Sequence, residues 1–173
     1  MGPEEDADRF IKEFRAHLSV IDELSNVILR AHLEVELALD EVVDLIFFRP
    51  EFVRKIGLKF FDKVQVAKAY APNPDAHDWK VIEALNEARN SMAHRRTSEQ
   101  RTAKIKKVRD SISNRGTQVF REEVKNADDK EVIILAAATG AGFLAFACDS
   151  IVKVRKTISA SLDVPEPPNM PED

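Results

Sequence analysis

The sequence predicts an all-α fold, an up-and-down bundle of about five to six helices followed by a disordered, Pro-rich tail. Three observations carry this prediction. Apolar residues recur at steps of three, four or seven, the spacing of a helix packed on one side. Only Pro50, Pro72 and Pro74 interrupt the interior of the chain. No stretch alternates apolar and polar residues as a strand would.

Length and composition favour one domain over residues 1–163. The chain has 173 residues, of which 44% are hydrophobic and 32% are charged. These values are typical of a soluble globular protein and exclude a fibrous or wholly disordered chain. Residues 164–173 contain four prolines, and such a segment cannot bury enough apolar surface to fold.

The first helical region covers residues 5–48. Its apolar stripe comprises Ile21, Leu24, Ile28, Val35, Leu39, Val42 and Ile46. Phe10, Phe14 and Leu18 repeat the spacing upstream, so the region is one long helix or two helices joined near Ser19. A second region follows Pro50 and ends at the loop 71–75, which contains two prolines. Its four-residue steps run through Phe52, Ile56, Phe60, Val64 and Ala67.

The third helix is expected to start near Asp75 or Asp78. Its apolar face comprises Trp79, Ile82, Leu85 and Met92. Residues 97–100, Thr-Ser-Glu-Gln, offer a capping box for a basic helix. That helix buries Ile105, Val108 and Ile112, and residues 113–116 should stop it.

Two further helices complete the prediction. Val119, Phe120 and Val124 indicate a short one, and Asp128-Asp129 would start a final helix that runs to about Leu162. Residues 132–148 form a run of seventeen without a charge, near the lower limit for crossing a membrane. Six are alanine and two are glycine, so we interpret the run as a buried helix. Its small residues, Ala137, Gly140, Ala141 and Gly142, would let a neighbouring helix approach closely.

Charge is distributed unevenly along the chain. Residues 1–48 hold twelve acids and four bases, whereas residues 89–115 hold nine bases and two acids. The basic residues are Arg89, Arg95, Arg96, Arg101, Lys104, Lys106, Lys107, Arg109 and Arg115. Such a segment favours a polyanionic partner, because neutralised phosphates release counterions. Alternatively it is a solvated helix face, or it pairs with the acidic segment of its own or a second chain.

The basic region begins with the sequence Arg-Asn-Ser-Met-Ala-His at residues 89–94. Arginine keeps its charge and fits phosphate oxygens, whereas histidine titrates near neutral pH. On one unbroken helix Arg89 and His94 are offset by about 140°, but Asn90 shares a face with His94 and could hold its imidazole. The alternatives are structural: Arg89 pairs with Glu83 or Glu87, and His94 is a cation at a helix C-terminus.

This motif resembles the signature of the HEPN family, an Arg followed directly by a polar residue and, a few residues later, by a His. The resemblance extends over about residues 20–95, and the layout is also similar to that of mannitol-operon-repressor-like proteins. It implies a helical bundle that dimerises so that two motifs face one cleft. Many members of the family are metal-independent endoribonucleases that act as toxins or in defence.

The resemblance implies roles for individual residues. His94 would be general acid or base at the ribose 2′-hydroxyl and leaving oxygen, Arg89 would stabilise phosphate charge, and Asn90 would orient one of them. RNA would be held by Arg95, Arg96, Arg101, Lys104 and Lys107. Arg96 occupies the place of the tyrosine that some HEPN toxins carry for modification by an antitoxin, so that modification is not expected. A non-catalytic HEPN-like regulator or interaction module is the alternative.

Other expectations concern setting and partners. Cys148 is the one cysteine, which excludes an intramolecular disulfide and, with an acidic N-terminus unlike a signal peptide, favours the cytoplasm. We expect RNA, a second copy of the chain and an antitoxin or regulatory protein as partners, with no membrane. We expect no metal and no cofactor, because His17, His32 and His77 lack ligand spacing. We expect His17 and His32 on helix flanks and the acids of residues 34–44 on a solvated face.

Overall fold

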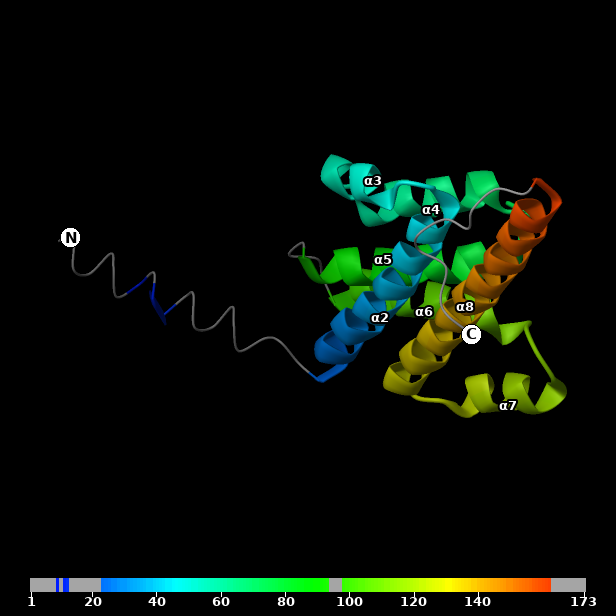
Figure 1. The fold of residues 1–173 in the computed structure, drawn as a ribbon. Helices are drawn as coiled ribbons and strands as arrows, with labels where there is room; N and C mark the ends of the chain where they lie inside the picture. Colours follow the sequence, from blue (N-terminus) through cyan, green and yellow to red (C-terminus); the bar gives the residue numbers. More distant parts are fainter. Residues whose placement is uncertain (1–8, 10, 13–22, 94–97, 163–173) are drawn as a thin grey trace.

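A computed structural model describes residues 9, 11–12, 23–93 and 98–162. These residues form helices and no strand, which confirms the predicted all-α helical bundle (Figure 1). From residue 23 onward, the described part of the chain contains seven helices. They are α2 (Glu23–Ile46), α3 (Pro50–Ile56), α4 (Phe60–Tyr70), α5 (His77–Ala93), α6 (Ser98–Ser113), α7 (Gln118–Asn126) and α8 (Asp129–Leu162).

The two longest helices, α2 and α8, run parallel, side by side (Figure 1). Near one end of the pair, Lys130 Nζ lies 3.0 Å from Glu23 Oε2. Near the other end, Arg155 Nη2 donates to the Phe47 carbonyl at 3.2 Å. Helix α5 packs against both members of this pair, α6 packs on α5 and α8, and α4 packs on α2 and α5. The bundle thus places α5, which carries the motif, against both long helices.

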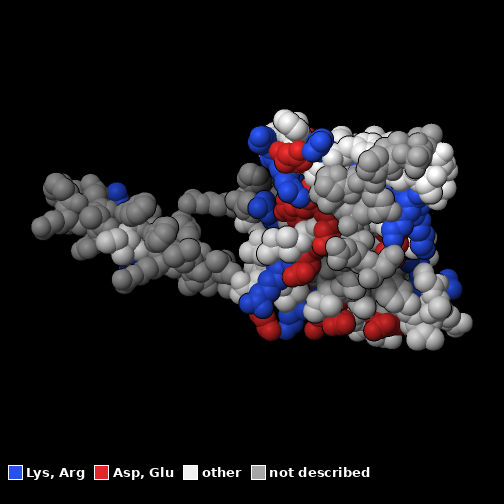
Figure 2. Space-filling model, in the orientation of Figure 1, with Lys and Arg blue, Asp and Glu red and all other residues white. Residues whose placement is uncertain are grey.

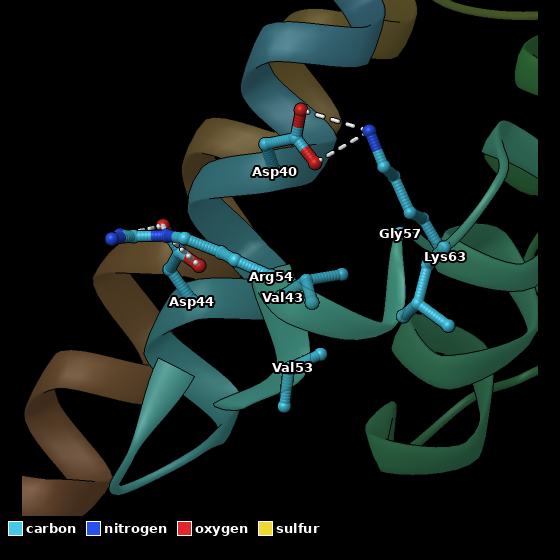
Figure 3. Close-up of a pocket in the computed structure, with 8 residues that line it drawn as sticks. Asp40, Val43, Asp44, Val53, Arg54, Gly57 and Lys63 are labelled. Atoms are coloured by element: carbon cyan, nitrogen blue, oxygen red, sulfur yellow. Dashed lines mark hydrogen bonds and ion pairs between the residues drawn. The ribbon is translucent and has the colours of Figure 1, made fainter. Parts of the chain in front are cut away.

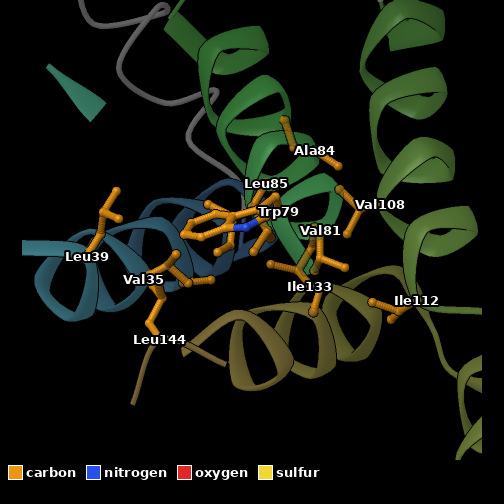
Figure 4. Packing of buried hydrophobic residues seen from close by; sticks show 14 of the residues in the cluster. Val35, Leu39, Trp79, Val81, Ala84, Leu85, Val108, Ile112, Ile133 and Leu144 are labelled. Atoms are coloured by element: carbon orange, nitrogen blue, oxygen red, sulfur yellow. The ribbon is translucent and has the colours of Figure 1, made fainter. Parts of the chain in front are cut away.

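One connected cluster of buried apolar residues joins α2 with α4 to α8. Trp79 lies at its centre and is 2% exposed, among Val35, Leu39 and Leu144 (Figure 4). Its indole meets the Phe143 ring edge-on, with ring centroids 4.9 Å apart. The side chains predicted for the apolar face of α5 are therefore in the core, with Met92 partly buried.

Gly57 divides the region expected as one helix between Pro50 and the loop 71–75. Its φ of 70° is left-handed, a conformation that costs other residues a Cβ clash, and its N–H donates to the Arg54 carbonyl at 3.2 Å. The Lys59 N–H then donates to Asp62 at 3.1 Å and starts α4. The prediction that Phe52 and Ile56 continue the apolar stripe is wrong: they are 62% and 71% exposed. Because of this break, the region forms two helices, α3 and α4, where we predicted one.

The later helices lie close to their predicted bounds. Helix α6 buries Ile105, Val108 and Ile112, as expected. The Thr117 hydroxyl caps α7 by accepting from the Phe120 N–H at 3.3 Å, and Val124 is buried, whereas Val119 is exposed. Asp128 accepts from the Glu131 N–H at 2.9 Å, which confirms the acidic start predicted for α8.

Helix α8 packs through its small residues as predicted, but only at particular positions. A Cβ added at Gly140 would lie 3.2 Å from the Ile82 side chain, so this glycine permits close contact with α5. A Cβ at Gly142 would meet nothing within 4 Å. By length and composition α8 is the one helix in the described ranges that could cross a membrane. Core helices of soluble proteins meet the same criterion, and Val132, Ile133, Ala136 and Leu144 of α8 are buried.

Several predictions fall on residues outside the described part of the chain. They concern the possible junction near Ser19, the capping threonine Thr97, and the tail 164–173. His94, Arg95 and Arg96 also lie outside the described residues. The described residues do not test these predictions.

Candidate functional site

The motif lies at the C-terminal end of α5. Arg89 is exposed and Asn90 is half-buried, and Arg89 Nη1 donates to Asn90 Oδ1 at 3.2 Å. Asn90 Nδ2 in turn donates to Asn86 Oδ1, one turn earlier, at 3.4 Å. Helix α5 is described as far as Ala93, and the described residues include two of the three predicted catalytic residues.

Arg89 makes no ion pair with a carboxylate of the described residues. The alternative that it pairs with Glu83 or Glu87 is wrong, because both acids have other partners. Glu83 accepts from Lys68 Nζ at 3.1 Å. Glu87 accepts from Lys104 Nζ at 2.7 Å and from Lys107 Nζ at 2.6 Å. The guanidinium of Arg89 is consequently exposed and held by a neutral amide, which leaves its charge for an anion.

A buried histidine from α2 extends this polar group. His32 is 6% exposed, and its Nε2 lies 3.2 Å from Asn86 Oδ1. Because an amide oxygen only accepts, Nε2 carries the hydrogen and donates it. The ring also packs on Phe60, with centroids 4.5 Å apart. The expectation that His32 lies on a helix flank is wrong; it joins the core to the motif through Asn86 and Asn90.

Burial lowers the pKa of His32 below its ordinary value of 6.5. The Asn86 hydrogen bond and the Glu36 charge oppose this effect, whereas the charges of Arg89 and Lys63 add to it. Glu36 Oε2 lies 3.7 Å from Nδ1. His32 is thus kept neutral by its surroundings, next to the cation of the motif.

Glu36 continues the network toward α4. Lys63 Nζ lies 3.0 Å from Glu36 Oε1 and 2.7 Å from Asp40 Oδ1. Burial lowers the pKa of Lys63, but its hydrogen bonds to Asp40 and Glu36 outweigh burial and raise that pKa overall. The expectation that the acids of residues 34–44 form a solvated face is therefore wrong for Glu36 and Asp40, which pair with Lys63. Glu34 and Glu41 are exposed.

Lys63 also lines a polar pocket of about 310 Å³ between α2, α3 and α4. Arg54 Nε donates to Asp44 Oδ1 at 3.1 Å on its rim, and Lys63 pairs with Asp40 (Figure 3). Each of these cations already has a carboxylate of the chain as its partner. The pocket therefore offers no uncompensated charge to a ligand.

The basic segment is largely paired within the fold. Lys104 and Lys107 share Glu87, whose pKa is lowered by the hydrogen bonds from Lys104 and Lys107. Arg109 reaches Asp129 at 3.1 Å, and Arg115 pairs with Asp78. Figure 2 shows acidic and basic side chains interspersed on the face that carries α2 and α8. Among the predicted RNA-binding residues, Lys104 and Lys107 share one glutamate, so this group of three side chains has one net positive charge. Arg101 also has an interaction partner.

Other chemistry is limited in the described residues. They contain no group of three or more His, Cys, Asp or Glu side chains placed to hold a metal ion. Burial raises the pKa of the Cys148 thiol to about 11, so this thiol stays protonated near neutral pH. A cysteine nucleophile at this position is therefore disfavoured.

The burial of His32 has a signal in the sequence. His32 is four residues after Ile28 and three before Val35, so it lies on the same buried stripe of α2. A histidine on such a stripe needs a hydrogen-bond partner in the core. That the partner is Asn86 depends on the packing of α2 against α5.

Comparison of the chain with protein-family models, with curated proteins and with solved structures finds no match.

Proposed function

We propose that this protein is a metal-independent endoribonuclease of the HEPN type, acting as a toxin or defence effector. Arg89, Asn90 and His94 form the catalytic group of this proposal, with His94 as general acid or base. One observation supports it most: Arg89 is exposed at the end of α5, without a carboxylate partner in the described residues and held by Asn90. A fixed, accessible guanidinium suits a phosphate whose charge increases in the transition state.

A composite site on a homodimer is part of the proposal, because an unbroken helix through His94 would offset Arg89 and His94 by about 140°. Helix α2 carries a stripe of exposed leucines, Leu29, Leu33 and Leu37, at four-residue spacing. We place the second copy on this exposed stripe of α2, the helix that also supplies His32 to the polar network. Isologous contacts of this kind are the commonest in homodimers.

Cleavage of RNA in EDTA by the wild type, Arg89→Ala and His94→Ala tests the chemistry. We expect each substitution to lower the cleavage rate by about 10² or more. Arg121→Ala is the matched control, since Arg121 is an exposed arginine on α7. Equal cleavage by all four proteins would assign the activity to a contaminant, and no cleavage of several RNAs by the wild type would remove the proposal.

Mixing the two inactive variants tests the composite site. In a heterodimer of Arg89→Ala with His94→Ala, one of the two sites keeps both side chains. Random pairing should therefore restore roughly a quarter of the wild-type rate. An inactive mixture that demonstrably exchanges subunits would mean that each site uses one chain alone.

Substitution on the leucine stripe tests the dimer itself. Leu33→Lys should convert a dimer to a folded monomer in light scattering and abolish cleavage. Val119→Lys is the control, because Val119 is an apolar side chain on α7 that is 78% exposed. A wild-type monomer that cleaves RNA would contradict the composite site but not the catalytic roles.

A non-catalytic regulator or interaction module is the second candidate. The observation that favours it is the pairing of Lys104 and Lys107 with Glu87, which reduces the charge available to hold RNA. RNA or protein binding without cleavage, unchanged in His94→Ala, would support this candidate over the nuclease.

A further inference from the structure

A second pocket, away from the motif, lies where the end of α4 and the start of α5 meet α8. Its volume is about 440 Å³, within the range of small-molecule sites. Most of the side chains that line it are apolar, and four are aromatic: Tyr70, Trp79, Phe143 and Phe146. Phe146 is 71% exposed and Trp79 is 2% exposed, so the pocket extends from the surface of α8 to the core. An apolar body of moderate size fits this lining.

Arg155 directly follows Val154, which lines the pocket, but is not itself a lining residue. This residue follows Ile151, which lines the pocket, by one turn of α8, and it is 6% exposed. Its Nη2 donates to the Phe47 carbonyl at 3.2 Å, and the Phe48 ring lies over the guanidinium with its centroid 4.9 Å from Cζ. Its Nη1 is buried and has no hydrogen-bond partner in the part of the chain that the structure describes. Among the described residues no carboxylate pairs with it.

Arg155 differs in this respect from the other cations that the fold partly buries. Lys63, Arg109 and Arg115 each reach a carboxylate. Burial lowers the pKa of Arg155. The nearby Tyr70, which lines the pocket, raises this pKa by a smaller amount. Arginine nevertheless stays charged. A buried charge without a counterion is costly, so an anion at this position would be bound favourably.

We propose that this pocket binds a small amphipathic carboxylate, with its apolar body among Tyr70, Trp79 and Phe146 and its carboxylate on Arg155. A medium-chain fatty acid has the required chemistry. The carboxylate would take the free Nη1, and the chain would run along α8 toward Phe146. This site is separate from Arg89 and does not rest on the proposed nuclease.

Trp79 provides the readout, because it is the one tryptophan of the chain. We expect decanoate, below its micellar concentration, to change the fluorescence of Trp79 saturably in the full-length protein. Decanol is the matched neutral ligand and should bind at least tenfold more weakly. Arg155→Met should lose this preference for decanoate, whereas Arg155→Lys should keep part of it. Arg121→Met should leave the binding unchanged.

Two results would overturn the proposal. One is a wild type that binds decanol as tightly as decanoate, or neither ligand, while thermal unfolding shows it folded. The other concerns the carboxylates of Asp163, Glu166, Glu172 and Asp173, which follow α8 in the sequence. If decanoate binds only after these four are changed to Asn, Gln, Gln and Asn, the chain itself supplies the anion. Ala147→Phe, which fills the pocket, should abolish binding of both ligands and so verifies the location.

Discussion

The two ends of α5 differ in how completely the fold satisfies their polar groups. At the C-terminal end, Arg89, Asn90, Asn86 and His32 form a chain of hydrogen bonds. Near the first turn, Trp79 Nε1 is buried and has no hydrogen-bond partner among the described residues, and the same holds for Arg155 Nη1 beside the adjacent pocket. The hydrogen bonds at the C-terminal end of α5 form between side chains of the chain itself, so folding alone explains them. Arg155, which has no carboxylate partner among the described residues, is the residue to which we assign an outside ligand.

Removal of Trp79 should have the largest effect on stability. Trp79→Ala deletes a side chain that is 2% exposed at the centre of the core. We expect the free energy of unfolding to fall by about 3–5 kcal/mol, from lost burial and a cavity. Urea denaturation measures this change. Phe146→Ala, in the same pocket but exposed, is the control and should cost under about 1 kcal/mol; equal losses would mean that the pocket is closed in solution.

Replacement of a paired and an unpaired cation by methionine tests the comparison directly. Lys63→Met leaves Glu36 and Asp40 without their cation and should lower the free energy of unfolding by about 1–3 kcal/mol. Arg155→Met removes a buried charge that has no carboxylate partner and should leave stability unchanged or raise it by about 1 kcal/mol. Chemical denaturation without added ligand measures both. A larger loss for Arg155→Met than for Lys63→Met would contradict the assignment of Arg155 to a ligand.

His32 should make stability depend on pH. Its pKa is lowered in the folded protein from 6.5, so the unfolded chain takes up the proton first. The stabilisation is complete above pH 6.5 and is lost as the pH falls toward the folded pKa, by at most about 1.4 kcal/mol per pH unit. Denaturation at several pH values should show a smaller slope for His32→Gln than for the wild type. Identical slopes would mean that His32 is solvated.

Asn90→Ala should have the smallest effect on stability. Asn90 is half-buried, and its bond to Asn86 is long at 3.4 Å, so we expect a loss of about 0.5 kcal/mol. If the proposed nuclease is correct, the same change should lower RNA cleavage by a much larger factor. A variant that loses stability and cleavage in proportion would show Asn90 to be only structural.

The fold could be predicted because helices obey local rules. Apolar spacing placed α2, α5, α6 and α8, and the acidic start of α8 was visible in Asp128-Asp129. The prediction for the region after Pro50 was wrong because local spacing does not show whether a helix face is covered. Phe52 and Ile56 keep the helical spacing, but Gly57 ends the helix and both side chains stay in water. Periodicity indicates which residues share a face, and packing decides whether that face is covered.

The candidate site could be predicted in part. The motif lies at the end of α5, with Arg89 and Asn90 in direct contact because they are adjacent in the sequence. The partners of the basic segment could not be assigned, since Lys104 and Lys107 meet Glu87 only where α6 packs on α5.

The sequence by itself determined the helical class, most helix bounds and the neighbouring motif residues, because these depend on interactions within a few residues. Only the tertiary structure decided that His32 meets Asn86, 54 residues away, and that Arg155 meets the Phe47 carbonyl, 108 residues away, with no carboxylate partner among the described residues. Such contacts depend on which helix faces pack together. The buried charge of Arg155, and the ligand inferred from it, follow from that packing alone.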